Sequence, residues 1–137
     1  MQRARATLSE PTDEAQRELL ARYVDAFERY DLDALTLLLH EDATQSMPPF
    51  ELWLRGHADI RSWYLGPGLE CAGSRLLAMV ANGSPAFGQY RPSPDGGHAA
   101  WALQVIEIAR GQTVGMNAFL DTPHLFPLFG LPLRLDS

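Results

Sequence analysis

The chain has 137 residues, a formal net charge of −6 from 17 acidic and 11 basic residues, and a hydrophobic fraction of 46%. This length fits one domain with its own core, and the acidic balance argues against direct binding of nucleic acid, since phosphates favour clustered basic side chains. No apolar run reaches the roughly 20 residues that span a bilayer, and the single cysteine, Cys71, excludes an internal disulfide and fits a reducing cytoplasm.

The first part of the chain has helical periodicity. Residues 1–10 have helical character with little apolar surface, and Pro11 interrupts them, so Thr12 or Asp13 is expected to cap a new helix. Apolar residues then recur at steps of three and four, and Asp31 is expected to start a second helix. These two helices predict a hairpin-like cover for a sheet.

The middle of the chain predicts two short strands and a third helix. Residues 43–47 and 50–54 have strand character, and the prolines between them lack amide donors, so this turn must lie at an edge or outside a ladder. Residues 58–65 form the expected third helix, which a glycine-rich turn ends.

The second half changes to strand periodicity. Residues 74–81, 85–91, 98–109 and 113–121 are four runs joined by tight turns such as Asn82-Gly83, which is typical of an antiparallel meander. Helices that come first and strands that come last predict an α+β layer fold. We expect three N-terminal helices to pack on a curved, mostly antiparallel sheet with an apolar pocket.

The C-terminal residues 125–132 are very apolar but interrupted by prolines. They cannot form a regular strand, so we expect them to be fixed on an apolar surface, either the domain's own or a partner's. The side chains assigned to this docking are Phe126, Leu128, Phe129 and Leu131.

Several of these features resemble a known family. The helix pair, the Arg55-Gly56 step before the third helix and the terminal meander are similar to the SnoaL-like branch of the NTF2-like superfamily, over about residues 15–122. The resemblance implies a cone-shaped fold. It does not imply one activity, because the superfamily includes cyclases, isomerases, dehydratases, epoxide hydrolases and non-catalytic modules.

Three stretches narrow the resemblance. Residues 46–56, 101–105 and 125–132 are similar to the C-terminal extension of actinobacterial, sigma-G-like extracytoplasmic-function (ECF) sigma factors that carry a SnoaL-like domain. Residues 2–8 resemble the last turns of the region-four helix-turn-helix domain of such factors. The sequence is thus identified as a relative of these extensions.

This resemblance implies a domain organisation and a role. Residues 1–11 are expected to be the remnant of the region-four helix and its linker, and residues 12–137 the SnoaL-like domain with its apolar tail. The implied role is non-catalytic regulation of transcription initiation, in the cytoplasm, with or without a small apolar ligand. The implied partners are sigma regions two and four in cis, and RNA polymerase through them, with no membrane and no direct nucleic-acid contact. A homodimer built through the sheet is a further alternative.

An alternative function is a small enzyme, a cyclase, isomerase or hydrolase. Its chemistry would be general acid–base catalysis by a carboxylate and an imidazole in an apolar setting. The candidates are Asp121 with His124 and Asp42 with His40, each pair at one end of a strand. The enzyme hypothesis requires Asp121 or Asp42 to point into a closed cavity. The alternative for these residues is that the carboxylates cap turns and the histidines are solvated.

Aromatic and polar side chains of the sheet and third helix are candidates for a ligand pocket, although most such residues form core. The residues assigned to this pocket are Trp53, Trp63, Tyr90, Trp101, Gln104, Met116, Asn117 and Phe119. The four histidines lack the paired spacing of metal ligands, so no metal site is expected. No dinucleotide or phosphate-loop fingerprint is present, and no cofactor is expected.

Overall fold

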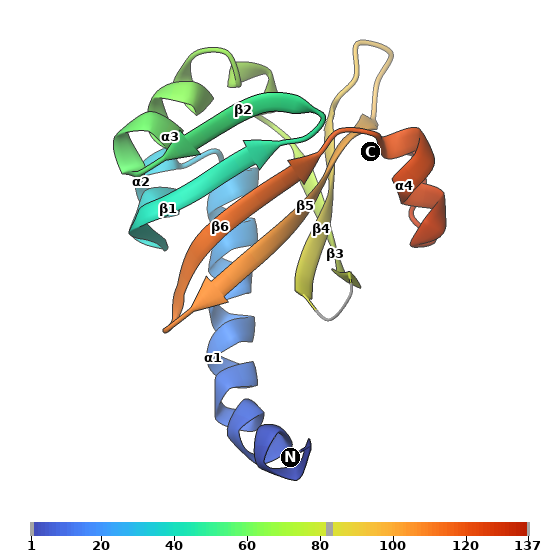
Figure 1. Cartoon of the computed structure of the whole chain (residues 1–137). Coiled ribbons are helices and arrows are strands. Elements are labelled where there is room, and N and C mark those ends of the chain that lie inside the picture. Colours follow the sequence, from blue (N-terminus) through green and yellow to red (C-terminus); the bar gives the residue numbers. More distant parts are fainter. Residues whose placement is uncertain (1, 82–83, 137) are drawn as a thin grey trace.

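A mixed sheet forms the centre of the structure, a computed structural model that describes residues 2–81 and 84–136 (Figure 1). In this part of the chain seven strands pair in the order β2-β1-β6-β5-β4-β3, and β7 pairs with β5. The β1–β6 pair is parallel and the other pairs are antiparallel. The expected α+β fold with a mostly antiparallel sheet is therefore confirmed.

The order of the elements also agrees with the sequence, apart from the tail. The bounds are α1 (Gln2–Glu28), α2 (Leu32–Leu37), β1 (Leu39–Met47), β2 (Phe50–Arg55), α3 (His57–Leu65), a short 3₁₀ turn (Leu69–Cys71), β3 (Arg75–Ala81), β4 (Ser84–Pro92), β5 (His98–Ala109), β6 (Gln112–Phe119), α4 (Thr122–Leu128) and β7 (Arg134–Leu135). The expected Asn82-Gly83 turn lies outside the described residues.

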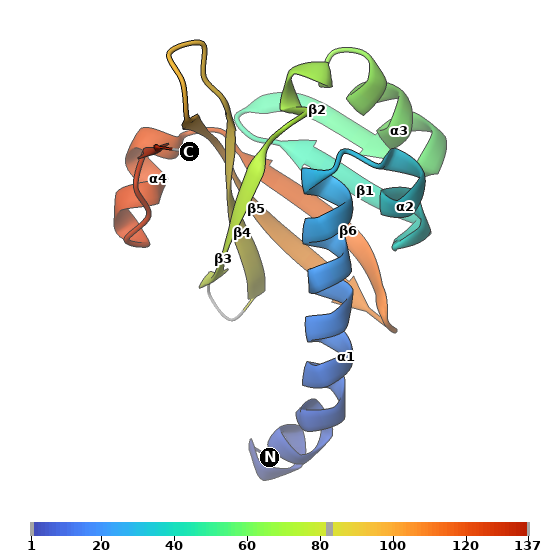
Figure 2. The same ribbon diagram turned by 180° about the vertical axis from the view of Figure 1, so that it is seen from behind.

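Helices α1, α2 and α3 cover one face of the sheet, which we call the inner face, and α4 packs against the opposite, outer face (Figures 1 and 2). The main core lies between α1, α3 and the inner face. Its buried aromatic members are Tyr23, Phe27, Tyr64 and Phe87. This arrangement buries the helical stripe that the three- and four-residue spacing predicted.

Helix α1 differs from the expectation at its N-terminus. It is continuous from Gln2 to Glu28, so the expected cap at Thr12 or Asp13 is wrong. Pro11 removes only one backbone donor, and the alanine, arginine and glutamate residues around it favour helix. In both ribbon views the N-terminal half of α1 extends past the sheet (Figures 1 and 2).

The end of α1 is tied to α3 through Tyr30. The Asp31 and Tyr30 amides donate to the carbonyl oxygens of Ala26 and Phe27 at 2.9 and 3.0 Å, which is the Schellman pattern of a helix end. Tyr30 occupies the left-handed position, φ 56°, where glycine is usual. Its hydroxyl lies 2.7 Å from the Tyr64 carbonyl oxygen and thereby holds the last turn of α3 against α1.

Asp31 begins α2 as expected. Its side chain accepts a hydrogen bond from the Ala34 amide at 3.1 Å, which is the usual role of an N-cap aspartate. The α1–α2 pair is therefore fixed by one tight turn, and the predicted hairpin-like cover is present.

The tail departs most from the expectation, because residues 122–128 form helix α4. Pro123 lies in the first turn, where a missing amide hydrogen costs nothing, and Pro127 lies near the end. After Gly130, at φ 71°, the chain turns back: the Leu131 amide donates to Phe126 O at 2.9 Å, and the Ala100 amide to Leu133 O at 2.8 Å. The tail is thus regular structure bound to the domain's own sheet.

Candidate functional site

A chain of buried hydrogen bonds fills the centre of the inner face. The Tyr23 hydroxyl donates to Gln104 Oε1 at 2.6 Å, Gln104 Nε2 to Gln89 Oε1 at 2.7 Å, and Gln89 Nε2 to Ser74 Oγ at 3.2 Å. Ser74 Oγ then donates to the Cys71 carbonyl oxygen at 2.6 Å. Burial raises the pKa of Tyr23 far above its usual 10, so the hydroxyl stays a neutral donor. Gln104, assigned to the ligand pocket, has both amide atoms engaged inside the protein.

Three other predicted pocket residues also lie on the inner side. Trp63 packs against both Gly68, where a side chain would overlap its ring, and the inner core. Trp101 packs in a smaller cluster, with the Arg91 guanidinium 4.8 Å from its ring centroid. Met116 is buried in the main core. These side chains fill space between the sheet and the helices.

The remaining predicted pocket residues lie away from this group. Tyr90 is buried and Phe119 partly buried in the cluster beneath α4. Asn117 Nδ2 donates to Glu107 Oε2 at 3.0 Å. Trp53 is 69% exposed on β2. The structure therefore divides the eight residues between the two sides of the sheet, and they do not line one common cavity.

The catalytic candidates form two separate exposed pairs. His124 Nδ1 lies 3.5 Å from Asp121 Oδ2, and the Asp121 side chain is 62% exposed. His40 Nδ1 accepts the Asp42 amide at 2.9 Å, while the Asp42 carboxylate, 63% exposed, lies 3.9 Å from an Arg55 nitrogen. Neither carboxylate has the enclosed position that the enzyme hypothesis requires. Asp121 stands at the helix start, as expected for a turn residue, although its side chain makes no capping hydrogen bond.

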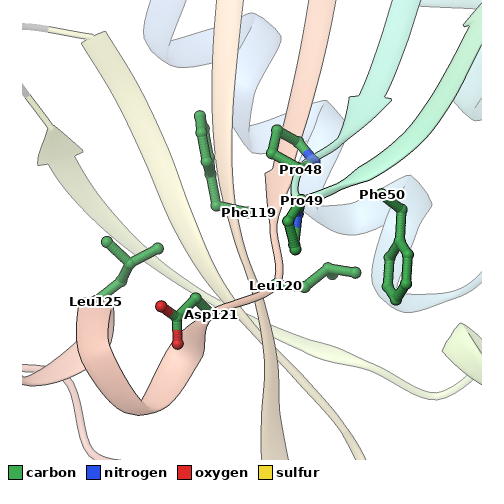
Figure 3. A pocket seen from close by; sticks show the side chains of 7 residues that line it. All are labelled: Pro48, Pro49, Phe50, Phe119, Leu120, Asp121 and Leu125. Atoms are coloured by element: carbon green, nitrogen blue, oxygen red, sulfur yellow. The ribbon is translucent and has the colours of Figure 1, made fainter.

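A pocket of about 540 Å³ opens where the β1–β2 turn approaches the start of α4 (Figure 3). The Leu120 amide donates to Pro48 O at 3.0 Å and holds this turn beside the end of β6. Asp121 is the charged group among apolar neighbours. The lining residues are Pro48, Pro49, Phe50, Phe119, Leu120, Asp121 and Leu125.

A second pocket, of about 470 Å³, continues from the first along the outer face. The two share Phe119 and Leu125, so they adjoin each other beside α4. The second pocket is lined by Ser84, Leu103, Val105, Glu107, Asn117, Phe119, Leu125 and Phe129. Phe119 and Asn117 were predicted to line a ligand pocket and Phe129 to dock a partner, and the structure places all three around this second pocket on the outer face. The sequence signal for α4 was Pro123 at the first turn of a helix.

The four tail residues assigned to partner docking separate into two kinds. Phe126 is fully buried, with its ring centroid 5.4 Å from that of Tyr90, and Leu131 packs in the same cluster. These two bind the domain's own sheet. Leu128 is 73% and Phe129 37% exposed, so they remain accessible to another molecule.

Within residues 2–81 and 84–136, no three His, Cys, Asp or Glu side chains come together as a candidate metal site. None of the helices formed by these residues has the length and apolar character needed to cross a membrane.

Comparison with known proteins identifies the family of this chain. The family model of the SnoaL-like domain matches residues 20–116. The chain is 39% identical over 127 residues to the ECF RNA polymerase sigma factor SigG of Mycobacterium tuberculosis, a match to 91% of this chain and 34% of that protein. The chain thus spans about a third of this relative's length, in its C-terminal part.

Solved structures show the same fold. An NTF2-like protein of unknown function from Burkholderia xenovorans superposes with a TM-score of 0.65 at 20% identity, covering 79% of this chain and 84% of that one. Another from Burkholderia pseudomallei gives a TM-score of 0.63 at 17% identity, with 84% and 97% coverage. At these identities the likeness concerns the fold alone.

Proposed function

The chain belongs to the SnoaL-like family, and from this premise we propose that it is a non-catalytic regulatory domain of an ECF sigma factor. It modulates transcription initiation through contacts with sigma regions two and four. The observation that carries the proposal is the 39% identity to SigG over 91% of the chain. Under this proposal the domain works in the cytoplasm.

The interior of the domain supports a role without catalysis. The Tyr23 hydroxyl and both amide atoms of Gln104 already make hydrogen bonds inside the protein, to each other and to Gln89. The Asp42 and Asp121 side chains are 63% and 62% exposed, so neither carboxylate lies in an enclosed site. An enzyme of the acid–base type would need a carboxylate at an enclosed place.

The surface supports a role in binding. Leu128 and Phe129 stand out from α4 while Phe126 anchors that helix, so the tail offers apolar side chains on a firmly held element. Aromatic side chains such as Phe129 are enriched at protein interfaces. A small apolar ligand would act in the same scheme only by favouring one docked arrangement over another.

The proposal also gives a role to the N-terminal part of α1. Residues 1–11 would be the end of the region-four helix and its linker, and residues 12–137 the regulatory domain. Because α1 is continuous from Gln2 to Glu28, the connection would be helical and stiff. Motion of the domain would then turn the preceding region with it.

The test is transcription by a fusion protein. This chain is joined after regions two and four of M. tuberculosis SigG, in place of the matched C-terminal third, and compared with a version ending before the domain. We expect promoter-dependent transcription by the two proteins to differ at least threefold with the same core polymerase. A matched fusion with Leu128→Ser and Phe129→Ser should lie nearer to the truncated protein. Equal transcription by all three would overturn the proposal.

A further inference from the structure

The two adjoining pockets beside α4 together make one surface region, which we call the α4 groove. It runs from Phe50 at the β1–β2 turn, past Phe119 and Leu125 in the middle, to Phe129 at the end of α4. One wall is α4 and the other is the outer face of β5 and β6 with the β1–β2 turn (Figures 1 and 3). The first pocket is lined almost entirely by apolar side chains, whereas the second combines apolar side chains with Ser84, Glu107 and Asn117.

The groove is open, which indicates the kind of occupant it fits. Phe50 is 68% exposed, and Asp121 on the opposite wall is mostly exposed as well. Small-molecule sites bury most of their ligand's surface, whereas these walls would leave one side of a small molecule in water. A polypeptide segment would cover the groove together with the exposed Leu128 beside it.

The two charged residues that line the groove are both acidic, and His124 lies next to one of them, 3.5 Å from Asp121. Asp121 lies in the first pocket and Glu107 in the second, and among the described residues no arginine or histidine lines either one. Glu107 Oε2 already accepts from Asn117, which holds the carboxylate in place. Electrostatic complementarity therefore selects a basic occupant over an acidic one.

We propose that the α4 groove binds a short segment of the sigma polypeptide outside this domain, with two apolar side chains flanked by arginine or lysine. One apolar side chain enters each pocket, and the basic groups approach Asp121 and Glu107. This inference rests on the proposed regulatory function and names the surface and the partner chemistry through which it acts. A segment in the groove would join α4 to the β1–β2 turn.

The first experiment measures binding to the full chain with synthetic peptides. The probe is an acetylated eight-residue peptide of alternating leucine and arginine, and its counterparts carry glutamate or glutamine in place of arginine. The arginine peptide should shift the amide signals of Phe119 and Leu125 in ¹⁵N NMR spectra. Its affinity should be at least tenfold higher than that of the glutamate peptide. Equal affinity for all three peptides, or shifts confined to other surfaces, would overturn the inference.

Variants separate the groove from general attraction to an acidic protein. Phe50→Ser changes an exposed side chain, so the fold is kept. It should lower the affinity for the arginine peptide at least fivefold. Asp121→Asn together with Glu107→Gln should lower this affinity by a similar factor and make it less dependent on salt concentration. The matched control is Asp95→Asn, an exposed acid outside the groove, which should change affinity less than twofold. A control effect equal to that of the groove variants would contradict the proposal.

Two other occupants are outcomes of the same study. Sedimentation of the free chain showing a dimer, with Phe119 and Leu125 amides protected in it, would assign the groove to a second copy and overturn the inference. Saturation of the groove by octylamine at the affinity of the arginine peptide would assign it to a small cation, with the same consequence.

The fusion protein distinguishes this inference from the proposed function. If removal of the domain changes transcription and Phe50→Ser has the same effect as removal, the inference is supported. If removal changes transcription but the groove variants do not, the inference fails while the proposed function stands. If removal changes nothing, the proposed function fails, and the groove loses its assigned partner whatever the peptides do.

Discussion

The attachment of α4 to the outer face gives the sharpest test of the structure, through the pair Phe126→Ala and Leu128→Ala. Phe126 is fully buried, its ring meets that of Tyr90, and its backbone carbonyl accepts the Leu131 amide. Leu128, two residues away on the same helix, is 73% exposed. The two substitutions remove apolar side chains from the same element, and only the first leaves a cavity.

The magnitudes follow from these positions. Truncation of a buried phenylalanine costs about 3–5 kcal/mol, whereas surface substitutions usually change stability by less than about 0.5 kcal/mol. Part of this cost should appear as local release of the tail, because α4 and β7 both pack on β5 and the tail is also held by Tyr90. A local cost of about 3 kcal/mol corresponds to exchange of the affected amides about a hundredfold faster, at about 1.4 kcal/mol per factor of ten.

The assay is amide hydrogen exchange with urea unfolding as a second readout. The Leu131 and Ala100 amides, which donate to Phe126 O and Leu133 O, should exchange at least a hundredfold faster in Phe126→Ala. They should change less than about threefold in Leu128→Ala, in line with a surface cost below about 0.5 kcal/mol. Similar acceleration in both variants would refute the conclusion that the tail is anchored on its own sheet through Phe126.

Three further outcomes follow from the interior and the turns. Tyr23→Phe should lower the free energy of unfolding by about 1–3 kcal/mol in urea titration, since the buried Gln104 Oε1 loses its 2.6 Å donor; an unchanged stability would show that this contact is not formed. Burial raises the pKa of Tyr23 and Tyr64 above the usual 10 and also raises the pKa of the Cys71 thiol, so stability should begin to fall near pH 9 through Cys71 and fall above pH 10 by about 1.4 kcal/mol per pH unit for each of the two tyrosines. A stability that rises or stays flat between pH 10 and 11 would contradict this. Gly97→Ala should cost more than Gly96→Ala by about 1–3 kcal/mol, because both have positive φ but only Gly97 faces the main-chain carbonyl of β7; equal melting temperatures would place β7 elsewhere.

Much of the fold was predictable from local signals. Alternation and turn residues located β5 at residues 98–109 without error, and Asp31 marked the start of α2. Both signals are local, since an N-cap and a pleat depend on a few neighbouring residues. The predicted helix break at Pro11 failed for the opposite reason: the effect of a proline on a helix depends on the helix propensity of many residues around it.

The candidate site was less predictable. Alternation alone separates Met116 from Asn117, because neighbours in a strand face opposite sides of a sheet, yet both were assigned to one pocket. The α4 groove combines Phe50 with Leu125, residues far apart in the sequence. Their proximity depends on α4, where Pro123 suits the first turn of a helix but Pro127 inside the same segment argues against one.

The most direct test of the regulatory role is transcription by SigG regions two and four with and without this domain fused behind them. Single-round assays at equal concentrations of core polymerase and promoter should show that the domain changes initiation at least threefold, and that Leu128→Ser with Phe129→Ser removes most of that change. Indistinguishable initiation with and without the domain would contradict the account, provided that NMR spectra show the fused domain to be folded.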